Sequence, residues 1–337
     1  MIENNILLSQ HTTFKIGGPA RFFIKVSTVP ELIDAVKYAK NLKIPFFVLG
    51  GGSNVLISDN GYKGVVIKIA LMGLSISENE ECFLIEGEAG EGWDDLVKET
   101  VSRNIGGLEN LSGIPGSVGA TPVQNIGAYG KEIRQYIQSV EAYDTKTEEI
   151  KILNNNECQF SYRESIFKND LGKHFIITKV LLRLPKKEPV NISYNDLQTF
   201  FGDKVTPSIK EIRRAVISIR KGKFPDLNIF GTAGSYFKNP IISKVRASTL
   251  KKRFPGMPVW DAGRNLSKLP AAYLVDKVAN LRGLKVGNAS IWDKQAIVLV
   301  NNGGATSKDF LALAQKIKEK VKEKTGINLE EEVCMVK

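Results

Sequence analysis

The sequence predicts a globular protein that combines α-helices and β-strands in two or three domains. The chain has 337 residues, of which 42% are apolar, enough to build sizeable hydrophobic cores. Strand-like runs of β-branched and aromatic residues alternate along it with amphipathic segments that begin at helix caps. A charged segment flanked by prolines, residues 185–189, ends the first region, so we expect a domain boundary near residues 200–208.

The N-terminal region predicts a β-α-β unit. Residues 28–31 form a capping box with a proline near the first helical position, and apolar residues follow at helical spacing. This pattern predicts a helix of about three turns. Strand-like sequences precede and follow it at residues 22–26 and 45–49, and a further strand is expected at residues 64–69.

Three consecutive glycines, Gly50, Gly51 and Gly52, lie in the segment VLGGGSNVLI. Glycine permits positive φ angles and lets another molecule approach the peptide N–H groups, so the run suggests a phosphate cradle. It fits neither a Walker loop, which needs Lys and Ser or Thr after the last glycine, nor a Rossmann fingerprint, which opens a helix. Residues 55–57 instead predict a strand. The loop alone is therefore as consistent with a tight connection between strands as with a ligand site.

A second glycine-rich segment is much longer. A helix expected at residues 93–103 is followed by GGLENLSGIPGSVGATPVQNIGAYG, residues 106–130. Its glycines and small hydroxyl residues are typical of loops, yet it carries too much leucine, isoleucine and valine for a disordered linker. Ordered loops of this length are usually functional. Small residues here would let the backbone pack against a large planar group.

The remaining elements follow from the same local signals. The sequence predicts a hairpin about Asp144, a strand at 174–184, a capped helix opening at 207–211, a helix at about 271–281, a strand at 296–300 and a helix at about 307–324. The last helix has its apolar residues on one face.

Charge and composition narrow the classes of partner. The formal net charge of +11 suggests nucleic acid, an anionic membrane surface or phosphate-bearing small molecules. Cys82, Cys158 and Cys334 are far apart and only two histidines are present, which favours neither a disulfide framework nor a metal site. The N-terminus lacks the features of a signal peptide, and no window is long and apolar enough for a membrane helix. We therefore expect a cytoplasmic protein without a metal.

Several segments, taken in order, carry a resemblance to a known family. HTTFKIGGPARFF, LGGGSNVL, ENLSGIPGSVGATPVQNIGAYG and FGTAGSYFKNP, with a terminal LEEEV, closely resemble the UDP-N-acetylenolpyruvoylglucosamine reductase family, in its branch with a tyrosine-bearing loop and a catalytic serine. The resemblance spans nearly the whole chain. It implies an α+β fold with a two-lobed FAD-binding domain of the vanillyl-alcohol-oxidase (PCMH) type and a C-terminal α/β substrate-binding domain. We assign residues 1–203 to the first domain, with lobes at about 1–70 and 71–203, and residues 204–337 to the second.

The resemblance also implies that both glycine-rich segments line FAD, with its pyrophosphate held by backbone N–H groups of the first. No histidine lies in these segments, so we expect FAD to be bound noncovalently. The residues that match cofactor-binding positions are Gly50, Gly51, Gly52, Ser53, Asn54, Ile114, Pro115, Gly116, Ser117, Gly119, Gln124, Asn125, Gly127, Ala128, Tyr129 and Gly130.

The family's reaction implies roles for three residues. In that reaction NADPH reduces FAD, and the reduced flavin delivers hydride to the enolpyruvyl group of a UDP-sugar, whose adjacent carbon must then be protonated. Arg163 in FSYRESIF matches the arginine at the substrate carboxylate, where a permanently charged planar fork is suitable. Ser235 in GTAGSYFKNP matches the proton donor, and Glu332 in LEEEV matches the catalytic carboxyl.

Further residues match positions that contact the UDP-sugar: Tyr162, Tyr194, Asn239, Gln295 and Lys223. Lys223 matches a lysine that either polarises the serine or binds phosphate. We expect a monomer that acts on a small molecule, without nucleic acid and without insertion into a membrane.

Two other functions remain open from the sequence alone. One is another flavin-dependent oxidase or dehydrogenase of the same fold, because a fold does not determine a function. Arg163, Ser235 and Glu332 together favour the reductase over that alternative. The other is a nucleic-acid-binding protein, which only the net charge suggests, since no recognition motif is present.

Overall fold

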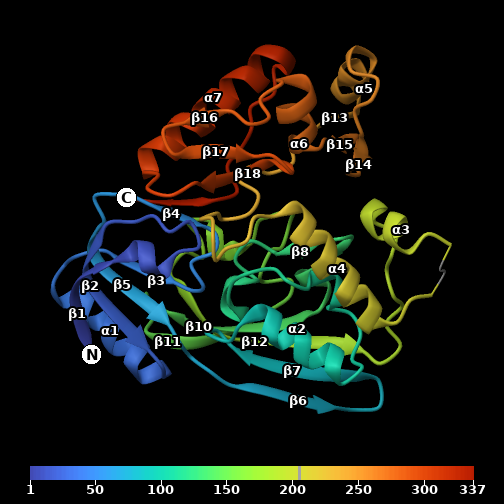
Figure 1. Ribbon diagram of the computed structural model, residues 1–337. Coiled ribbons are helices and arrows are strands. Elements are labelled where there is room, and N and C mark those ends of the chain that lie inside the picture. The colour runs from blue at the N-terminus through green and yellow to red at the C-terminus, as the bar shows by residue number, and fades with distance from the viewer. Residues whose placement is uncertain (204–205) are drawn as a thin grey trace. The chain divides into compact units, whose positions relative to one another are not determined.

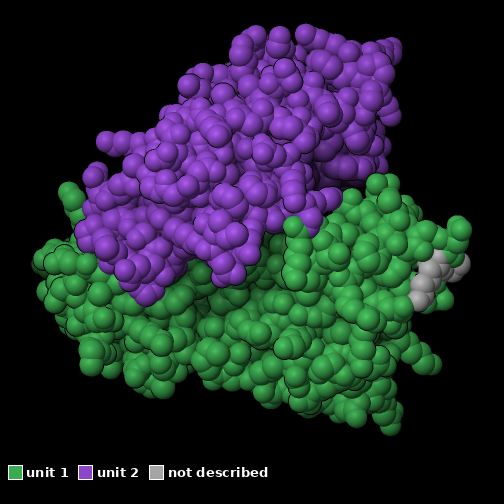
Figure 2. Space-filling model, in the orientation of Figure 1, with its two compact units in different colours: residues 1–6, 20–52, 63–221 green, residues 7–19, 53–62, 222–337 purple. Residues whose placement is uncertain are grey.

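The computed structural model describes residues 1–203 and 206–337, and this part of the chain divides into two compact units. The first unit comprises residues 1–6, 20–52 and 63–221, and the second comprises residues 7–19, 53–62 and 222–337 (Figure 2). Lys204, where the sequence places the start of the second domain, lies outside the described residues.

Helix α4 (Ile209–Lys223) belongs almost entirely to the first unit, although the sequence places it in the second domain. The reason is its buried face, because Ile212, Ala215 and Val216 pack with Tyr129 and Leu197 of the first unit. The predicted helix start is confirmed: Ser208 Oγ accepts from the Glu211 N–H at 3.3 Å, and the Glu211 carboxylate accepts from the Ser208 N–H at 2.8 Å.

The first lobe of this unit is built on a four-stranded sheet in the order β1-β2-β5-β3 (Figure 1). Its elements are β1 (Ile2–Leu7), β2 (Pro19–Val26), α1 (Val29–Asn41), β3 (Phe46–Leu49) and β5 (Tyr62–Ile69). The predicted cap of α1 is confirmed, because Thr28 Oγ1 accepts from the Glu31 N–H at 3.3 Å. The predicted β-α-β unit is present, and β3 also pairs in parallel with β5.

The second lobe holds a five-stranded antiparallel sheet in the order β11-β10-β12-β7-β6. Its elements are β6 (Leu74–Glu78), β7 (Cys82–Glu88), α2 (Trp93–Ser102), β10 (Ile137–Asp144), β11 (Glu149–Asn154) and β12 (Phe175–Pro185). The predicted hairpin is β10 and β11, and Asp144 Oδ1 accepts from the Lys146 N–H at 2.8 Å in its turn. One apolar core joins the two lobes.

The long glycine-rich stretch is ordered, as predicted, and forms only short elements. These are the 3₁₀ turns Glu109–Leu111 and Val118–Ala120 and the short strand β8 (Gly127–Ala128); β9 (Lys131–Glu132), which pairs with β8, and the 3₁₀ turn Ile133–Gln135 follow the stretch. Leu108, Leu111 and Val118 are fully buried in the core of the two lobes. Helix α3 (Asn195–Phe201), which the sequence did not predict, follows β12.

The second unit contains three small sheets. Its elements are β4 (Val55–Ile57), β13 (Ile241–Ser243), α5 (Lys244–Arg253), β14 (Trp260–Asp261), β15 (Leu266–Lys268), α6 (Ala271–Tyr273), β16 (Lys285–Val286), β17 (Ala289–Trp292), β18 (Gln295–Asn301), α7 (Ser307–Thr325) and β19 (Cys334–Val336). The predicted strand at 296–300 and the last helix are confirmed. The helix expected at 271–281 is shorter. Its α-helical part, α6, ends at Tyr273, and the π-helical segment Leu274–Val278 follows it.

The core of the second unit includes residues from near the N-terminus. Phe14, Ile16 and Leu56 pack with the apolar face of α7, and the rings of Phe14 and Phe310 meet edge to face at 4.6 Å. Strand β4 pairs in parallel with β19 at the other end of the chain. No helix among the described residues is long and apolar enough to span a membrane.

Candidate functional site

The two glycine-rich segments lie against each other within the first unit. A Cβ atom on Gly51 would lie 2.7 Å from Gly116 Cα, and one on Gly50 would lie 2.7 Å from Ser117 Oγ. Gly52 and Gly116 also have positive φ angles of 68° and 134°. Larger residues would therefore separate the segments or strain the backbone.

Backbone N–H groups gather where these segments meet. Among the described residues, no protein acceptor is found for the N–H groups of Gly51, Gly52, Gly116 and Ser117. Ser117 is buried, and a buried donor without an acceptor is costly unless a ligand or water supplies one. Neighbouring amides of this kind form concave sites for anions, so they fit the pyrophosphate of FAD.

Lys68 also contacts these amides' loop, although it was not among the residues predicted from the sequence. It lies on β5 opposite Leu49, and its Nζ donates a hydrogen bond to the carbonyl of Gly50. Because a peptide unit is planar, holding that carbonyl also orients the Gly51 N–H, which points the opposite way. Burial lowers the pKa of Lys68, and the charge of Lys25 lowers it further. The only sign of this role in the sequence is the position of Lys68 within a strand of mostly apolar residues.

The next part of the long stretch is anchored to α2 and to Ala89, the residue after β7. The Gly116 carbonyl accepts from the Trp93 N–H at 3.0 Å, and the Gly119 N–H donates to the Ala89 carbonyl at 3.0 Å. A Cβ on Gly119 would lie 2.5 Å from Ala89 Cβ, so this glycine is required for close packing. Ile114 is half-buried and Pro115 is exposed.

The side chain of Asn125 makes its hydrogen bonds within the protein. Its Nδ2 donates to the Ser161 carbonyl at 2.9 Å and to Glu132 at 3.1 Å, and its Oδ1 accepts from the Arg134 N–H at 3.1 Å. Any contact of Asn125 with a cofactor therefore comes from its backbone. Its φ of 45° lies in the left-handed region that side chains other than glycine rarely adopt, which is common where a loop serves a site.

Arg163 lies beside the same stretch. Its Nη2 donates to the Gly127 carbonyl at 2.7 Å and its Nη1 to the Asn125 carbonyl at 3.4 Å. Its guanidinium carbon lies 5.5 Å from the centre of the Tyr162 ring, and its own φ is 57°. The structure thus brings two of the predicted substrate residues, Arg163 and Tyr162, to the predicted cofactor segment.

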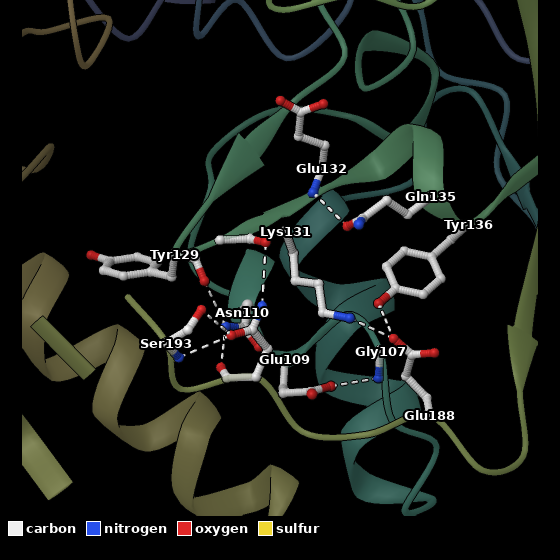
Figure 3. A network of polar contacts seen from close by, with 12 residues as sticks. Gly107, Glu109, Asn110, Tyr129, Lys131, Glu132, Gln135, Tyr136, Glu188 and Ser193 are labelled. Atoms are coloured by element: carbon white, nitrogen blue, oxygen red, sulfur yellow. Dashed lines mark hydrogen bonds and ion pairs between the residues drawn. The ribbon is translucent and has the colours of Figure 1, made fainter. Parts of the chain in front are cut away.

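Tyr194 lies against the end of that segment. Its ring meets the ring of Tyr129 edge to face, with centres 5.3 Å apart. Tyr194 is 41% exposed, whereas Tyr129 is buried, and burial raises the pKa of Tyr129 to about 12. Figure 3 shows Tyr129 among the polar contacts that hold the surrounding chain.

In the second unit, Ser235 follows a tight turn, as the sequence predicts. Gly234 has a φ of 75°, and its N–H donates to Thr232 Oγ1 at 3.2 Å. After the turn the chain runs antiparallel to β18, where the Tyr236 N–H donates to the Ile297 carbonyl at 2.7 Å. The turn at Gly234 therefore lies at the start of a segment that pairs with β18.

The C-terminal segment that carries Glu332 pairs with this chain. The Glu332 N–H donates to the Tyr236 carbonyl at 2.8 Å, so Glu332 stands opposite Tyr236 and next to the position of Ser235. Asn54 Nδ2 donates to the Glu332 carbonyl at 3.1 Å, and the Cys334 N–H donates to the Asn54 carbonyl at 2.9 Å. Asn54, matched to a cofactor-binding position, thus holds the segment that carries Glu332.

The three glutamates of LEEEV have different surroundings. Glu331 forms an ion pair with Lys318 on α7 at 2.9 Å. Glu330 has 75% of its side chain exposed and lies 3.5 Å from Lys238. Both of these carboxylates face lysines, whereas the backbone of Glu332 is held by Tyr236 and Asn54.

Three other predicted substrate residues also lie in the second unit. Asn239 Oδ1 accepts from the Ala271 N–H at 2.9 Å, which caps the start of α6. Gln295 opens β18, and Lys223 is the last residue of α4. Within the described residues no group of His, Cys, Asp or Glu is arranged to hold a metal ion.

These features define an FAD-binding protein with a two-lobed cofactor domain and a separate C-terminal domain. Residues 20–153 match a family model for an FAD binding domain, and residues 226–336 match one for the C-terminal domain of UDP-N-acetylenolpyruvoylglucosamine reductase. The chain belongs to the UDP-N-acetylenolpyruvoylglucosamine reductase family, which confirms the resemblance and the predicted fold class.

Individual relatives match over nearly their full length. A curated protein of this name from Flavobacterium johnsoniae is 41% identical over 99% of both chains. One from Aliivibrio fischeri is 40% identical over 98% of this chain and 93% of its own. The crystal structure of UDP-N-acetylenolpyruvylglucosamine reductase from Thermus caldophilus is similar with a TM-score of 0.70 at 28% identity, covering 100% of this chain and 99% of that one.

Proposed function

We propose that the protein reduces UDP-N-acetylglucosamine enolpyruvate to UDP-N-acetylmuramate with NADPH and FAD, a step in the synthesis of peptidoglycan precursors. One observation carries the proposal beyond family membership: in the second unit the segment of Glu332 pairs with the segment of Ser235, with Glu332 opposite Tyr236, the residue after Ser235. A reduction of a carbon–carbon double bond needs a proton donor as well as an electron source, and an oxidase has no need of this pair.

The cofactor would be held by the first unit. The N–H groups of Gly51, Gly52, Gly116 and Ser117 fit the pyrophosphate, and Lys68 orients the first of them. Bound FAD would accept two electrons from NADPH and pass them on to the enolpyruvyl double bond. The other cofactor contacts assigned from the family would lie along residues 114–130.

The substrate carboxylate would be bound by Arg163. Its guanidinium is held in place by the carbonyls of Asn125 and Gly127, so little side-chain entropy is lost when a carboxylate binds. Negative charge that builds up on the carboxylate during reduction is stabilised by this fixed cation. Glu332 would serve as the catalytic carboxyl in the second unit.

Ser235 would complete the reaction by donating its hydroxyl proton to the carbon next to the carboxylate. Lys223 would either polarise that hydroxyl or bind phosphate. Tyr162, Tyr194, Asn239 and Gln295 would contact the UDP-sugar. The proposal includes a monomer in the cytoplasm that acts on this small molecule, without nucleic acid and without insertion into a membrane.

The proposal is tested by product analysis under anaerobic conditions. Beyond the one equivalent that reduces the flavin, NADPH should be consumed only when the enolpyruvyl UDP-sugar is present, and the sugar product should be heavier by two hydrogen atoms. NADPH oxidation that requires oxygen and leaves the sugar unchanged would instead identify a flavin oxidase. Gel filtration of the purified protein tests the monomer separately.

A further inference from the structure

The segment of residues 188–194, which leads into α3 and carries Tyr194, is bound to the glycine-rich stretch by buried polar side chains (Figure 3). Asn110, fully buried in the 3₁₀ turn Glu109–Leu111, is the central contact. Its Nδ2 donates to the Tyr129 carbonyl at 2.9 Å and to the Asn191 carbonyl at 2.8 Å. One amide group therefore spans the predicted cofactor stretch and the Tyr194 segment.

The chemistry of this contact requires an amide. The two hydrogens of one NH₂ group satisfy two carbonyl oxygens, which a hydroxyl or a carboxylate cannot do. If the Asn110 amide were reversed, its oxygen would face two other oxygens, so its orientation is determined by its partners.

A second contact holds the start of the same segment. Glu188 Oε1 accepts from Lys131 Nζ at 2.5 Å and from the Tyr136 hydroxyl at 2.7 Å. Only 9% of the Lys131 side chain and 15% of the Glu188 side chain are exposed. An ion pair this buried is costly to break, because one charge would remain without a partner.

Together the two contacts set where Tyr194 lies. From the surface side, Asn191 Nδ2 donates to the Gly130 carbonyl at 3.3 Å, and Asn191 Oδ1 accepts from the Ser193 N–H at 2.9 Å. Tyr194 follows directly and packs its ring on Tyr129. The distance between the Tyr129 and Asn191 carbonyls, which Asn110 determines, thus controls the position of the Tyr194 ring.

We propose that Asn110 is a positioning residue for substrate binding, which acts through Tyr194 and touches neither cofactor nor substrate. This inference rests on the proposed function, since it takes Tyr194 to contact the UDP-sugar. It predicts that altering Asn110 weakens substrate binding while the half-reaction between NADPH and flavin is preserved.

Asn110→Asp is the most direct variant, because it keeps the shape and replaces the donor by a carboxylate facing two carbonyls. The KM for the enolpyruvyl UDP-sugar should rise about tenfold or more, as expected for the loss of roughly 1.4 kcal/mol of binding. FAD retention and the rate of flavin reduction by NADPH should stay within about twofold. The KM defect should shrink at lower pH, because burial raises an aspartate pKa and a protonated carboxyl can donate again.

Asn155→Asp is the matched control. Asn155 Nδ2 also donates to two backbone carbonyls, those of Arg134 at 2.8 Å and Ile137 at 2.7 Å, but it does not touch the Tyr194 segment. Its substitution should leave the KM unchanged and without the added pH dependence. Equal KM changes in both variants would show that loss of a structural amide, rather than positioning of Tyr194, is responsible.

Asn191→Ala keeps the test decisive if Asn110→Asp does not fold. It removes the contacts to Gly130 and Ser193 from the half-buried side, and the KM should again rise while flavin reduction stays unchanged. An unchanged KM in the folded variants overturns the inference, provided that the wild type reduces the sugar. A wild type that does not reduce the sugar overturns the proposed function instead.

Discussion

Gly51 has no room for a side chain, because Gly116 Cα would lie 2.7 Å from its Cβ. Beside it, the N–H groups of Gly52, Gly116 and Ser117 have no protein acceptor among the described residues. The glycines of VLGGGSNVLI therefore do more than connect strands. They bring two loops close together, and we propose that the amides of these loops form one anion site.

Gly51→Ala should weaken FAD binding about tenfold or more, because the added methyl group pushes the two loops apart. The FAD dissociation constant of the apoprotein, measured by fluorescence titration, checks this. Gly222→Ala is the control, since its Cβ would meet nothing within 4 Å and its φ is not positive. If Gly51→Ala binds FAD as tightly as Gly222→Ala, the loop is only a strand connection.

Ser235→Ala should separate the two half-reactions. Without the hydroxyl, NADPH should still reduce the flavin, but reduction of the enolpyruvyl sugar should slow by about 10²–10⁴-fold, the usual contribution of a general acid. Stopped-flow absorbance of each half-reaction checks this, with Ser218→Ala, at an exposed position of α4, as control. Equal losses in both halves would make Ser235 a structural residue.

At the scale of elements, α2 and α4 are joined by one bidentate ion pair. Arg213 donates from Nη1 and Nη2 to the two oxygens of Asp94, at 2.6 Å and 2.8 Å. Asp94 also accepts from the Gly113 N–H at 2.6 Å, at the start of the predicted flavin segment. Burial alone would raise the pKa of Asp94, but the hydrogen bonds from Arg213 and Gly113 outweigh it and hold the pKa below its usual value.

Arg213→Met should therefore lower the free energy of unfolding by about 1–2 kcal/mol at neutral pH. The effect is this small because Asp94 is partly exposed and solvent screens its attraction to Arg213. A carboxyl with a lowered pKa stabilises the fold above that pKa and loses this contribution as the pH falls through it. The difference from wild type should thus persist down to about pH 4 and shrink below it.

Urea unfolding of the variant across this pH range gives the measurement. Arg214→Met is the matched control, because Arg214 is the next residue, is exposed, and has no carboxylate partner among the described residues. A difference for Arg213→Met that grows as the pH is lowered would contradict the assigned ion pair.

At the scale of the whole molecule, the second unit is assembled from three separate parts of the chain. Phe14 and Leu56 are buried in its core, and β4 is the partner of β19. Residues 222–337 alone should therefore fail to unfold cooperatively, because they lack these contacts. Thermal unfolding of the fragment beside the full chain checks this, and a sharp transition in the fragment would show that the N-terminal parts are dispensable.

The sequence predicted those parts of the fold that depend on local signals. The cap at Thr28, the capping box at Ser208 and the hairpin turn at Asp144 each act within a few residues, so their patterns are readable. Contacts between distant parts leave no such pattern. The packing of Phe14 on α7 and the place of α4 in the first unit depend on which apolar faces meet in three dimensions.

The same distinction holds at the candidate site. The glycines, Arg163 and Ser235 could be assigned from the sequence because they lie in recognisable motifs. Lys68 and Asn110 were not, since a lysine in a strand and an asparagine in a loop are ordinary in sequence. Their importance comes from partners far along the chain, the Gly50 carbonyl for one and the Asn191 carbonyl for the other.

The central claim, that electrons pass from NADPH through FAD to the enolpyruvyl sugar, is tested most directly by anaerobic flavin absorbance. NADPH is added first to the FAD-loaded protein, and the enolpyruvyl UDP-sugar is added once the flavin is bleached and the excess NADPH is removed. The account predicts that the oxidised flavin spectrum returns without oxygen, with one reduced sugar formed per flavin. A flavin that stays bleached until oxygen is admitted would contradict it.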